Sequence, residues 1–208
     1  MTTNANTIIE TDINDINTGT YTVLTQIAAD LLGLPVSQVE VRLGDTDFPP
    51  AAGSGGSVGA CSSGSSVYVA CKKIRETLAK ELGVEADNLT LHDGQASGNG
   101  ISKPIQELIE DDIVTLGMIE PGKTSMDYTQ ASFGAHFAEV AVNAITGETR
   151  IRRMLGVFTA GRILNEKTAR SQCYGGMVFG IGAALMEELL HDPRNGRLLN
   201  HDLAEYHV

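Results

Sequence analysis

The amino-acid sequence predicts an α+β fold in two lobes, with mixed or antiparallel sheets flanked by helices. Three observations support this prediction. Apolar side chains recur with the period of a helix in three long stretches and alternate with the period of a strand in four shorter ones. Between residues 120 and 129 no period is visible. A chain of 208 residues can bury one large core or two small ones without disulfides or a structural metal.

The first lobe, residues 1–119, begins with a helix followed by a strand. Residues 21–32 have apolar side chains at helical spacing, and Gly33 is a plausible helix stop. Residues 39–43 alternate apolar and charged side chains, as expected for a strand with one buried face. The first unit is therefore helix, tight loop and strand.

The same order returns fifty residues later, which indicates an internal repeat. Leu32-Gly33 corresponds to Leu82-Gly83, with a helix around Val67–Leu78 before it and a strand around Leu89–Leu91 after it. Two copies are too few for a solenoid, so we expect them to share a sheet. Beyond them the sequence predicts a turn, a flexible loop and a short helix, at Asp93-Gly94, residues 96–100 and residues 104–110.

Residues 120–129 are the expected linker, and residues 130–208 the second lobe. Two strand-like runs, 133–143 and 150–159, flank a glycine-containing connection and predict an antiparallel hairpin. After it, an apolar stripe with four-residue spacing extends from Ala169 to Leu189 and predicts one long helix. Its four glycines each cost about 1 kcal/mol relative to alanine, which predicts close packing or a ligand against the helix.

Composition and charge exclude several functions. The formal net charge of −11 disfavours a nucleic-acid partner, and no apolar run is long enough to span a bilayer. Three unpaired cysteines and five scattered histidines have no zinc-site spacing, so we expect no metal held by protein side chains. With no visible signal peptide, the expected compartment is the reducing cytoplasm.

Two glycine-containing stretches precede helices, at residues 17–22 and 53–59. A helix N-terminus offers unpaired N–H groups and partial positive charge, and small residues let an anion approach them. Each stretch is thus either an anion cradle or, alternatively, a threonine cap or a surface loop. Neither contains the lysine of a P-loop nor a complete dinucleotide fingerprint after a strand.

Taken in order, several blocks from Asp12 onward resemble the molybdenum-cofactor-binding subunit of the xanthine dehydrogenase and aldehyde oxidase family, the molybdenum hydroxylases. The ordered set is more specific than any one block. The blocks are Asp15–Thr22 with Gln26; Leu43–Pro50 leading into Gly53–Gly59; the hairpin around Thr146-Gly147-Glu148; and Asn165, Thr168 and Gln172 followed by Gly175-Gly176 and Gly180–Gly182.

The resemblance implies a molybdopterin-binding-domain fold and a molybdopterin cofactor, in bacteria often the cytosine dinucleotide. Members of the family hydroxylate aldehydes or nitrogen heterocycles such as purines with oxygen from water. Electrons leave through iron–sulfur and FAD partner subunits or domains. Because the cofactor's own sulfurs hold the metal, the family needs no protein ligands to molybdenum. Export to the periplasm with a partner stays an alternative.

The resemblance also places individual residues. Gly55, Gly56 and Ser57 match the segment that approaches molybdenum and pterin, and Gln172 matches an amide offered to the pterin. The cradle for pterin or phosphates matches Thr18, Gly19, Thr20 and Thr22. Each of these residues also has a purely structural interpretation, such as a helix cap for Thr22.

Two departures from the family pattern bear on function. Asn17 stands where the family has glycine, and asparagine tolerates a left-handed backbone better than most residues. In addition, no glutamate lies in a glycine-rich segment like that of the family's general base, since Glu187, Glu188 and Glu205 have the pattern of a solvated surface. We therefore expect a fragment that is inactive and without cofactor on its own. The alternatives are a non-catalytic cofactor-binding or assembly module and, less favoured, a generic nucleotide-binding protein.

Overall fold

A computed structural model describes residues 6–208, and the chain divides into two compact units. Unit 1 extends to Lys123, and unit 2 comprises Thr124–Val208. The stretch 120–129 spans this boundary and contains one short helix, α3 (Thr124–Asp127). Each unit is described by itself.

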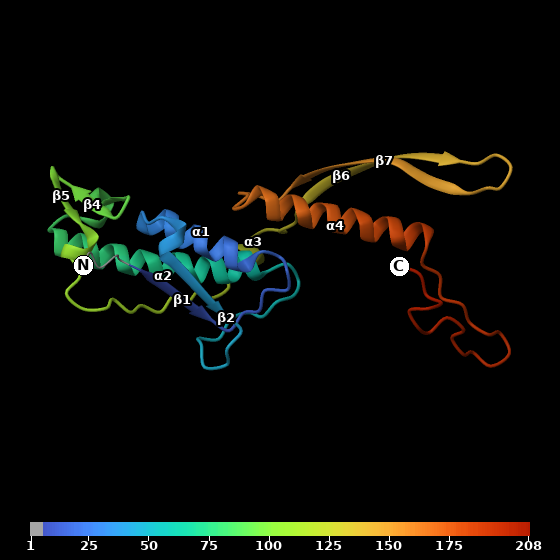
Figure 1. Cartoon of the computed structure of the whole chain (residues 1–208), viewed down its shortest axis with the longest axis horizontal. Helices are drawn as coiled ribbons and strands as arrows, with labels where there is room; N and C mark the ends of the chain where they lie inside the picture. Colours follow the sequence, from blue (N-terminus) through green and yellow to red (C-terminus); the bar gives the residue numbers. More distant parts are fainter. Residues whose placement is uncertain (1–5) are drawn as a thin grey trace. The chain divides into compact units, whose positions relative to one another are not determined.

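Unit 1 contains two long helices packed side by side, a pair of strands and a small separate sheet (Figure 1). In chain order its elements are β1 (Thr7–Thr11), α1 (Thr20–Leu32), η1 (Val36–Gln38), β2 (Val39–Leu43), α2 (Gly59–Leu82), η2 (Ala86–Asn88), β3 (Thr90–His92), β4 (Gln95–Gly98), β5 (Ile101–Pro104) and η3 (Ile105–Glu107).

The first three main elements form a β-α-β unit. β1 and β2 pair in parallel, with Ile9 opposite Val41 and Thr11 opposite Leu43, and α1 is the connection between them. The predicted helix, its stop at Gly33 and the following strand are confirmed; Gly33 has a φ of 61° and ends α1. Because parallel strands run in the same direction, the loops after β1 and β2 leave from the same edge.

The expectation that the two repeated strands share a sheet is wrong. β2 pairs with β1, which the periodicity did not predict, whereas β3 belongs to an antiparallel sheet with the order β3-β4-β5. The turn at Asp93-Gly94, which is confirmed, folds the chain after β3 straight back along it. β3 therefore forms its strand hydrogen bonds with the adjacent β4, and β2 pairs with the N-terminal strand β1, which is more distant in sequence.

Two local expectations after this turn are also corrected. Residues 96–100, expected as a flexible loop, form most of β4 and the turn into β5. Ala96 is fully buried there, because the strand packs against α2. The helix expected over 104–110 shortens to the single turn η3, which begins directly after Pro104.

The core of unit 1 lies between the two helices and the strands. Leu24 and Ala28 of α1 and Leu78 of α2 are completely or almost completely buried. The helices approach closely at Gly64, where an added Cβ would lie 2.9 Å from Ile27 Cδ1. The Arg75 guanidinium donates to the carbonyl oxygens of Leu31 (2.7 Å) and Leu89 (2.9 Å), and so joins the end of α1 to the start of β3.

Unit 2 consists of the predicted hairpin and the predicted long helix. β6 (Phe133–Val142) and β7 (Thr149–Thr159) pair antiparallel around a turn at Gly147, with a bulge between Glu139 and Val140. The helix, α4 (Glu166–Leu185), begins with the Asn165 side chain accepting the Thr168 N–H at 3.0 Å. Its less exposed face carries the predicted stripe at Ala169, Cys173, Met177 and Ile181.

α4 ends four residues earlier than the stripe predicts. The Asn200 side chain accepts the N–H of Leu190 and donates to the carbonyl oxygen of Glu188, which draws the chain away from the helical path. Residues 190–200 then form a turn in which Asp192 accepts from Arg194. A long-range contact therefore outcompetes the local periodicity at this point.

Candidate functional site

The carboxyl edge of the β1–β2 pair is the place where the two glycine-containing stretches of the sequence meet. The loop after β1 leads into the N-terminus of α1, and the loop after β2 leads into the N-terminus of α2 (Figure 1). Gly44 N–H donates to the Thr11 carbonyl oxygen at 3.3 Å, so the loops start beside each other. Ligands of open α/β sheets characteristically bind outside this edge.

The start of α1 is capped by a residue that the sequence analysis did not identify as a cap. The Asp15 carboxylate accepts the N–H groups of Thr18 (3.0 Å), Gly19 (3.2 Å) and Tyr21 (3.4 Å). Negative charge at a helix N-terminus is stabilising, and an aspartate just before a helix is the signal that could have revealed it. Asn17 has a φ of 69°, so it adopts the left-handed conformation expected of a residue in a glycine's place.

The candidate residues at this helix differ in how accessible they are. Gly19 is the residue that precedes the first turn, with a φ of 86°. Thr20 is buried, and its hydroxyl lies 3.4 Å from the hydroxyl of the half-buried Thr18. Thr22 is exposed on the first turn. Hydroxyl groups at 18 and 22 are therefore the ones that this segment presents to its surroundings.

The second stretch forms a tight turn directly before α2. Gly56 and Ser57 both have positive φ, 58° and 59°, and Val58 N–H donates to the Gly55 carbonyl oxygen at 3.3 Å. Two central residues with positive φ define a type I′ turn, which disfavours a side chain such as that of Ser57. A Cβ added at Gly55 or Gly56 would meet nothing within 4 Å.

The N-terminus of α2, unlike that of α1, has no side-chain cap. Val58 precedes the first turn and cannot accept a hydrogen bond through its side chain, and no acidic residue lies in that turn. Neither the residue before this 24-residue helix nor an acidic side chain in its first turn therefore offsets the partial positive charge of its N-terminus. One turn further, the Ser63 hydroxyl is buried and has no hydrogen-bond partner among the described residues. Both features suit an anionic or hydrogen-bonding group.

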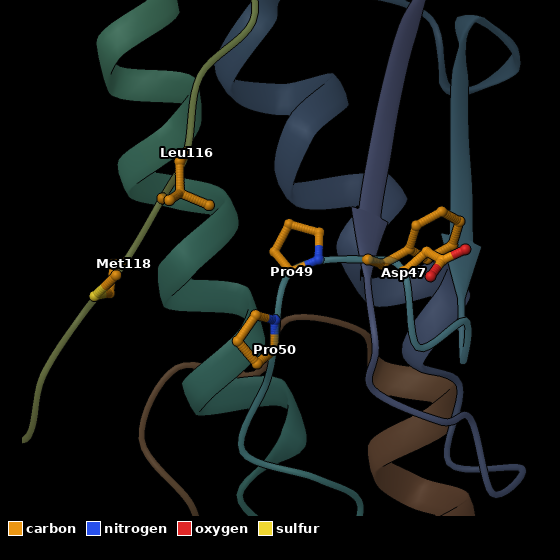
Figure 2. A pocket seen from close by; sticks show the side chains of 7 residues that line it. Asp47, Pro49, Pro50, Leu116 and Met118 are labelled. Carbon is orange, nitrogen blue, oxygen red and sulfur yellow. The ribbon is translucent and has the colours of Figure 1, made fainter.

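A shallow hollow of about 430 Å³ lies beside the loop after β2. Figure 2 shows Pro49 and Pro50 on one side of it and Leu116 and Met118 on the other. Leu116 and Met118 belong to an extended segment along α2, held where Lys73 Nζ donates to the Leu116 carbonyl oxygen at 2.8 Å. The hollow is mainly apolar, so it can accept a flat or apolar group but offers little chemistry of its own.

Gln172 lies in unit 2, on an exposed part of α4. The glycines that follow it leave free space, since a Cβ added at Gly175, Gly176 or Gly180 would meet nothing within 4 Å. The structure brings the other seven candidate residues to one edge of unit 1. Gln172 stays a prediction from the sequence.

Glu187 is more than the solvated side chain that the sequence suggested. Its carboxylate accepts the Tyr206 hydroxyl at 2.8 Å and raises the pKa of that tyrosine.

In the described part of the chain no group of histidine, cysteine or acidic residues could hold a metal ion. Cys61, Cys71 and Cys173 are free thiols. Over residues 6–208, no helix has the length and apolar character to cross a membrane.

Comparison with known proteins identifies the class to which this fold and edge belong. The family described as "Molybdopterin cofactor-binding domain" matches residues 1–208, and the chain belongs to that family. The resemblance inferred from the sequence blocks is thereby confirmed.

Two relatives of the chain are named as molybdenum-binding subunits. It is 49% identical over 206 residues to the aldehyde oxidoreductase molybdenum-binding subunit PaoC of Escherichia coli, covering 99% of this chain and 28% of that protein. It is 31% identical over 220 residues to the putative xanthine dehydrogenase molybdenum-binding subunit XdhA of Escherichia coli, covering 95% and 28%. The chain thus spans little more than a quarter of the length of these relatives.

Solved structures share the fold. Quinoline 2-oxidoreductase from Pseudomonas putida superimposes with a TM-score of 0.72 at 23% identity, covering 93% of this chain and 27% of that chain. Reconstituted CO dehydrogenase from Oligotropha carboxidovorans superimposes with a TM-score of 0.76 at 22% identity, covering 93% and 26%. At these identities the likeness establishes the mixed α+β fold, which confirms the predicted fold class.

Proposed function

We propose that the chain supplies part of the molybdopterin site of a molybdenum hydroxylase that oxidises aldehydes or nitrogen heterocycles with oxygen from water. The observation that carries this proposal is the uncapped N-terminus of α2, reached through the open turn Gly55–Ser57 at the carboxyl edge of β1–β2. The family membership and the aldehyde oxidoreductase relative support the same class of reaction.

The residues at this edge fit a large anionic cofactor. The first-turn N–H groups of α2 and the free space at Gly55 and Gly56 suit a phosphate or the flat edge of a pterin. Thr18 and Thr22 offer hydroxyl donors on the neighbouring loop, beside Gly19 and Thr20. When bound, the cofactor supplies the redox chemistry at molybdenum, and these residues bind and orient it. The cytosine dinucleotide form is part of the proposal.

Catalysis needs more than these residues. No described glutamate of the chain lies in the glycine-rich setting that the family's general base occupies, and Glu187 is engaged with Tyr206. We expect the 208-residue chain to be inactive and to lack cofactor when purified alone. In the complete enzyme, iron–sulfur and FAD subunits or domains would accept the electrons, in the cytoplasm or, for an exported complex, the periplasm.

Gly55 provides a direct test of the cradle. It has no positive φ and no neighbour within 4 Å of an added Cβ, so Gly55→Val fills the space without straining the fold. In the complete product of the reading frame, we expect this variant to lose most of its bound molybdenum, measured by mass spectrometry of the metal, at an unchanged melting temperature. Thr90→Val, which also places a valine at an exposed position of unit 1, in β3, is the control. Full molybdenum content in Gly55→Val would refute the assignment of this turn.

The alternative is a cofactor-binding or assembly module without catalysis. The exposed, uncapped edge is compatible with transient binding as well as with a resident cofactor. Metal analysis and ultraviolet-visible spectra of the purified chain, beside the complete product of the reading frame, separate the two. Cofactor in the chain alone, without turnover of aldehyde by the complete product, would favour the module.

A further inference from the structure

We propose that the four residues directly after β1, Asp12-Ile13-Asn14-Asp15, act as a hub that holds both glycine-containing loops as one preformed site, with Asp12 and Asp15 as its positioning residues. This inference rests on the proposed function, because it concerns how the same cofactor site is shaped. None of the four was among the candidate site residues, yet every one contacts one of the two loops or the helix start that follows it.

Asp12 binds the loop after β2 with both its backbone and its side chain. Its N–H donates to the Pro49 carbonyl oxygen at 3.1 Å, and its carboxylate accepts the N–H of Ala51. Asp12 is half-buried, and a carboxylate that accepts a backbone N–H forms a charge-assisted hydrogen bond. Two bonds in opposite directions fix the position and the orientation of residues 49–51 relative to the end of β1.

Ile13 and Asn14 extend the contact toward α2. Ile13 is 1% exposed, and its Cδ1 lies 3.2 Å from the position of a Cβ on Gly59, the first residue of α2. The Asn14 carbonyl oxygen accepts the Ser54 hydroxyl, one residue before the turn that starts at Gly55. The second loop is therefore attached to the hub on both sides of its turn.

Asp15 binds the other loop. Its Oδ1 accepts the N–H groups of Thr18 and Gly19, and its Oδ2 accepts that of Tyr21. These three bonds order the segment that contains the half-buried Thr18 and the left-handed Asn17. One short stretch of chain thus fixes both loops.

The physical consequence is preorganisation. Glycine-containing loops lose much conformational entropy when they become ordered, and a ligand that must order them binds more weakly. The hub orders them during folding instead. Removing one carboxylate that accepts backbone N–H groups should therefore weaken cofactor binding by about tenfold or more.

Amide hydrogen exchange of the purified chain, resolved by residue with NMR, tests the geometry without any cofactor. We expect Asp15→Ala to speed exchange at Thr18, Gly19 and Tyr21, and Asp15→Asn, which keeps one acceptor oxygen, to have a smaller effect. Asp12→Ala should speed exchange at Ala51 and, through the hub, at Thr18 and Gly19. Asp30→Asn, which makes the same charge change at an exposed position of α1, is the matched control. Independent responses of the two loops would overturn the hub.

A second measurement asks whether the hub serves the cofactor. In the complete product of the reading frame, Asp12→Ala and Asp15→Ala should lower molybdenum content several-fold, whereas Asp30→Asn should not. The measurement is made at a temperature below the melting temperatures of all the variants. Loosened loops with unchanged molybdenum content would overturn the positioning role. A wild-type protein without molybdenum would instead overturn the proposed function, and the exchange experiment would still decide whether the loops are held as one.

Discussion

Ser57 is a serine in a backbone conformation that glycine adopts most easily. Its φ of 59°, next to Gly56 at 58°, strains the turn before α2 by about 1 kcal/mol. Strain of this kind persists where the surrounding structure, or a function, requires it. The Ser57 hydroxyl lies at the candidate cradle, so a functional role would explain why this strained residue is a serine. Engineered variants at this position separate the effect of strain from that of function.

We expect Ser57→Gly to raise the free energy of unfolding by up to about 1 kcal/mol, because glycine relieves the strain. Ser57→Val should lower it by more than 1 kcal/mol, since a β-branched residue fits this conformation worst. Urea denaturation of the purified chain measures both. Equal stability of the two variants would show that the turn relaxes. In the complete product of the reading frame, loss of molybdenum in the stabilised Ser57→Gly would support the proposed contact of the hydroxyl with the cofactor.

Cys71 is a buried thiol in the middle of α2, and burial raises its pKa from 9.0 to about 11. The folded state favours the neutral thiol, so its contribution to stability is complete below pH 9 and is lost as the pH rises to about 11. We expect the unfolding free energy of the wild type to fall over this range more steeply than that of Cys71→Ala.

Iodoacetamide should modify the exposed Cys61 quickly and Cys71 only after unfolding.

At the scale of elements, Arg75 connects parts of unit 1 that are distant in sequence. Its guanidinium bonds two carbonyl oxygens, at the end of α1 and just before β3, from a half-buried position on α2. Without the guanidinium, the carbonyl oxygens of Leu31 and Leu89 would lose these hydrogen bonds. A bulky apolar replacement keeps the packing of the stem and removes only the donors.

We therefore expect Arg75→Met to lower the free energy of unfolding of unit 1 by about 2 kcal/mol. Lys72→Met, an exposed position on the same helix, should change it by less than about 0.5 kcal/mol. Chemical denaturation followed by circular dichroism gives both values. If the two variants were equally stable, water would replace the guanidinium without loss, and the connection would be incidental.

The two units differ in the source of their stability. The buried apolar side chains among the described residues all belong to unit 1. In unit 2 large apolar side chains such as Phe133, Phe137 and Phe179 are more than half exposed. A two-stranded hairpin beside one helix is marginal in water without a buried core. Local stability should therefore be distributed unevenly along the chain.

Amide exchange of the whole chain tests this distribution. We expect slow exchange in α1 and in the buried half of α2, around Leu24 and Leu78, and exchange at least tenfold faster throughout β6, β7 and α4. Mass spectrometry of peptide fragments resolves the two units. Comparable protection in both would mean that unit 2 has a source of stability that its own packing does not provide.

The sequence by itself determined the features that depend on neighbouring residues. The helical periods, the stops at Gly33 and Gly83 and the hairpin around Gly147 are local, and the structure confirms each. The ordered glycine and threonine blocks also sufficed for the family, which the comparison confirms. The helical, turn and hairpin signals each lie within a short stretch of chain, and the family signal is the order of such stretches along it.

Only the tertiary structure decided what those features do together. β1 pairs with β2 across 32 positions of sequence, Thr7 opposite Val39, and that pairing places both glycine-containing loops at one edge. The bonds of the hub to the loop after β2, and those of Asn200 beyond the early end of α4 at Leu185, likewise depend on contacts that no local period encodes. Strand pairing and loop contacts depend on the balance of burial and hydrogen bonding over the whole chain. A sequence pattern therefore predicts which segments are strands or loops, and only the folded chain shows which of them pair or are in contact.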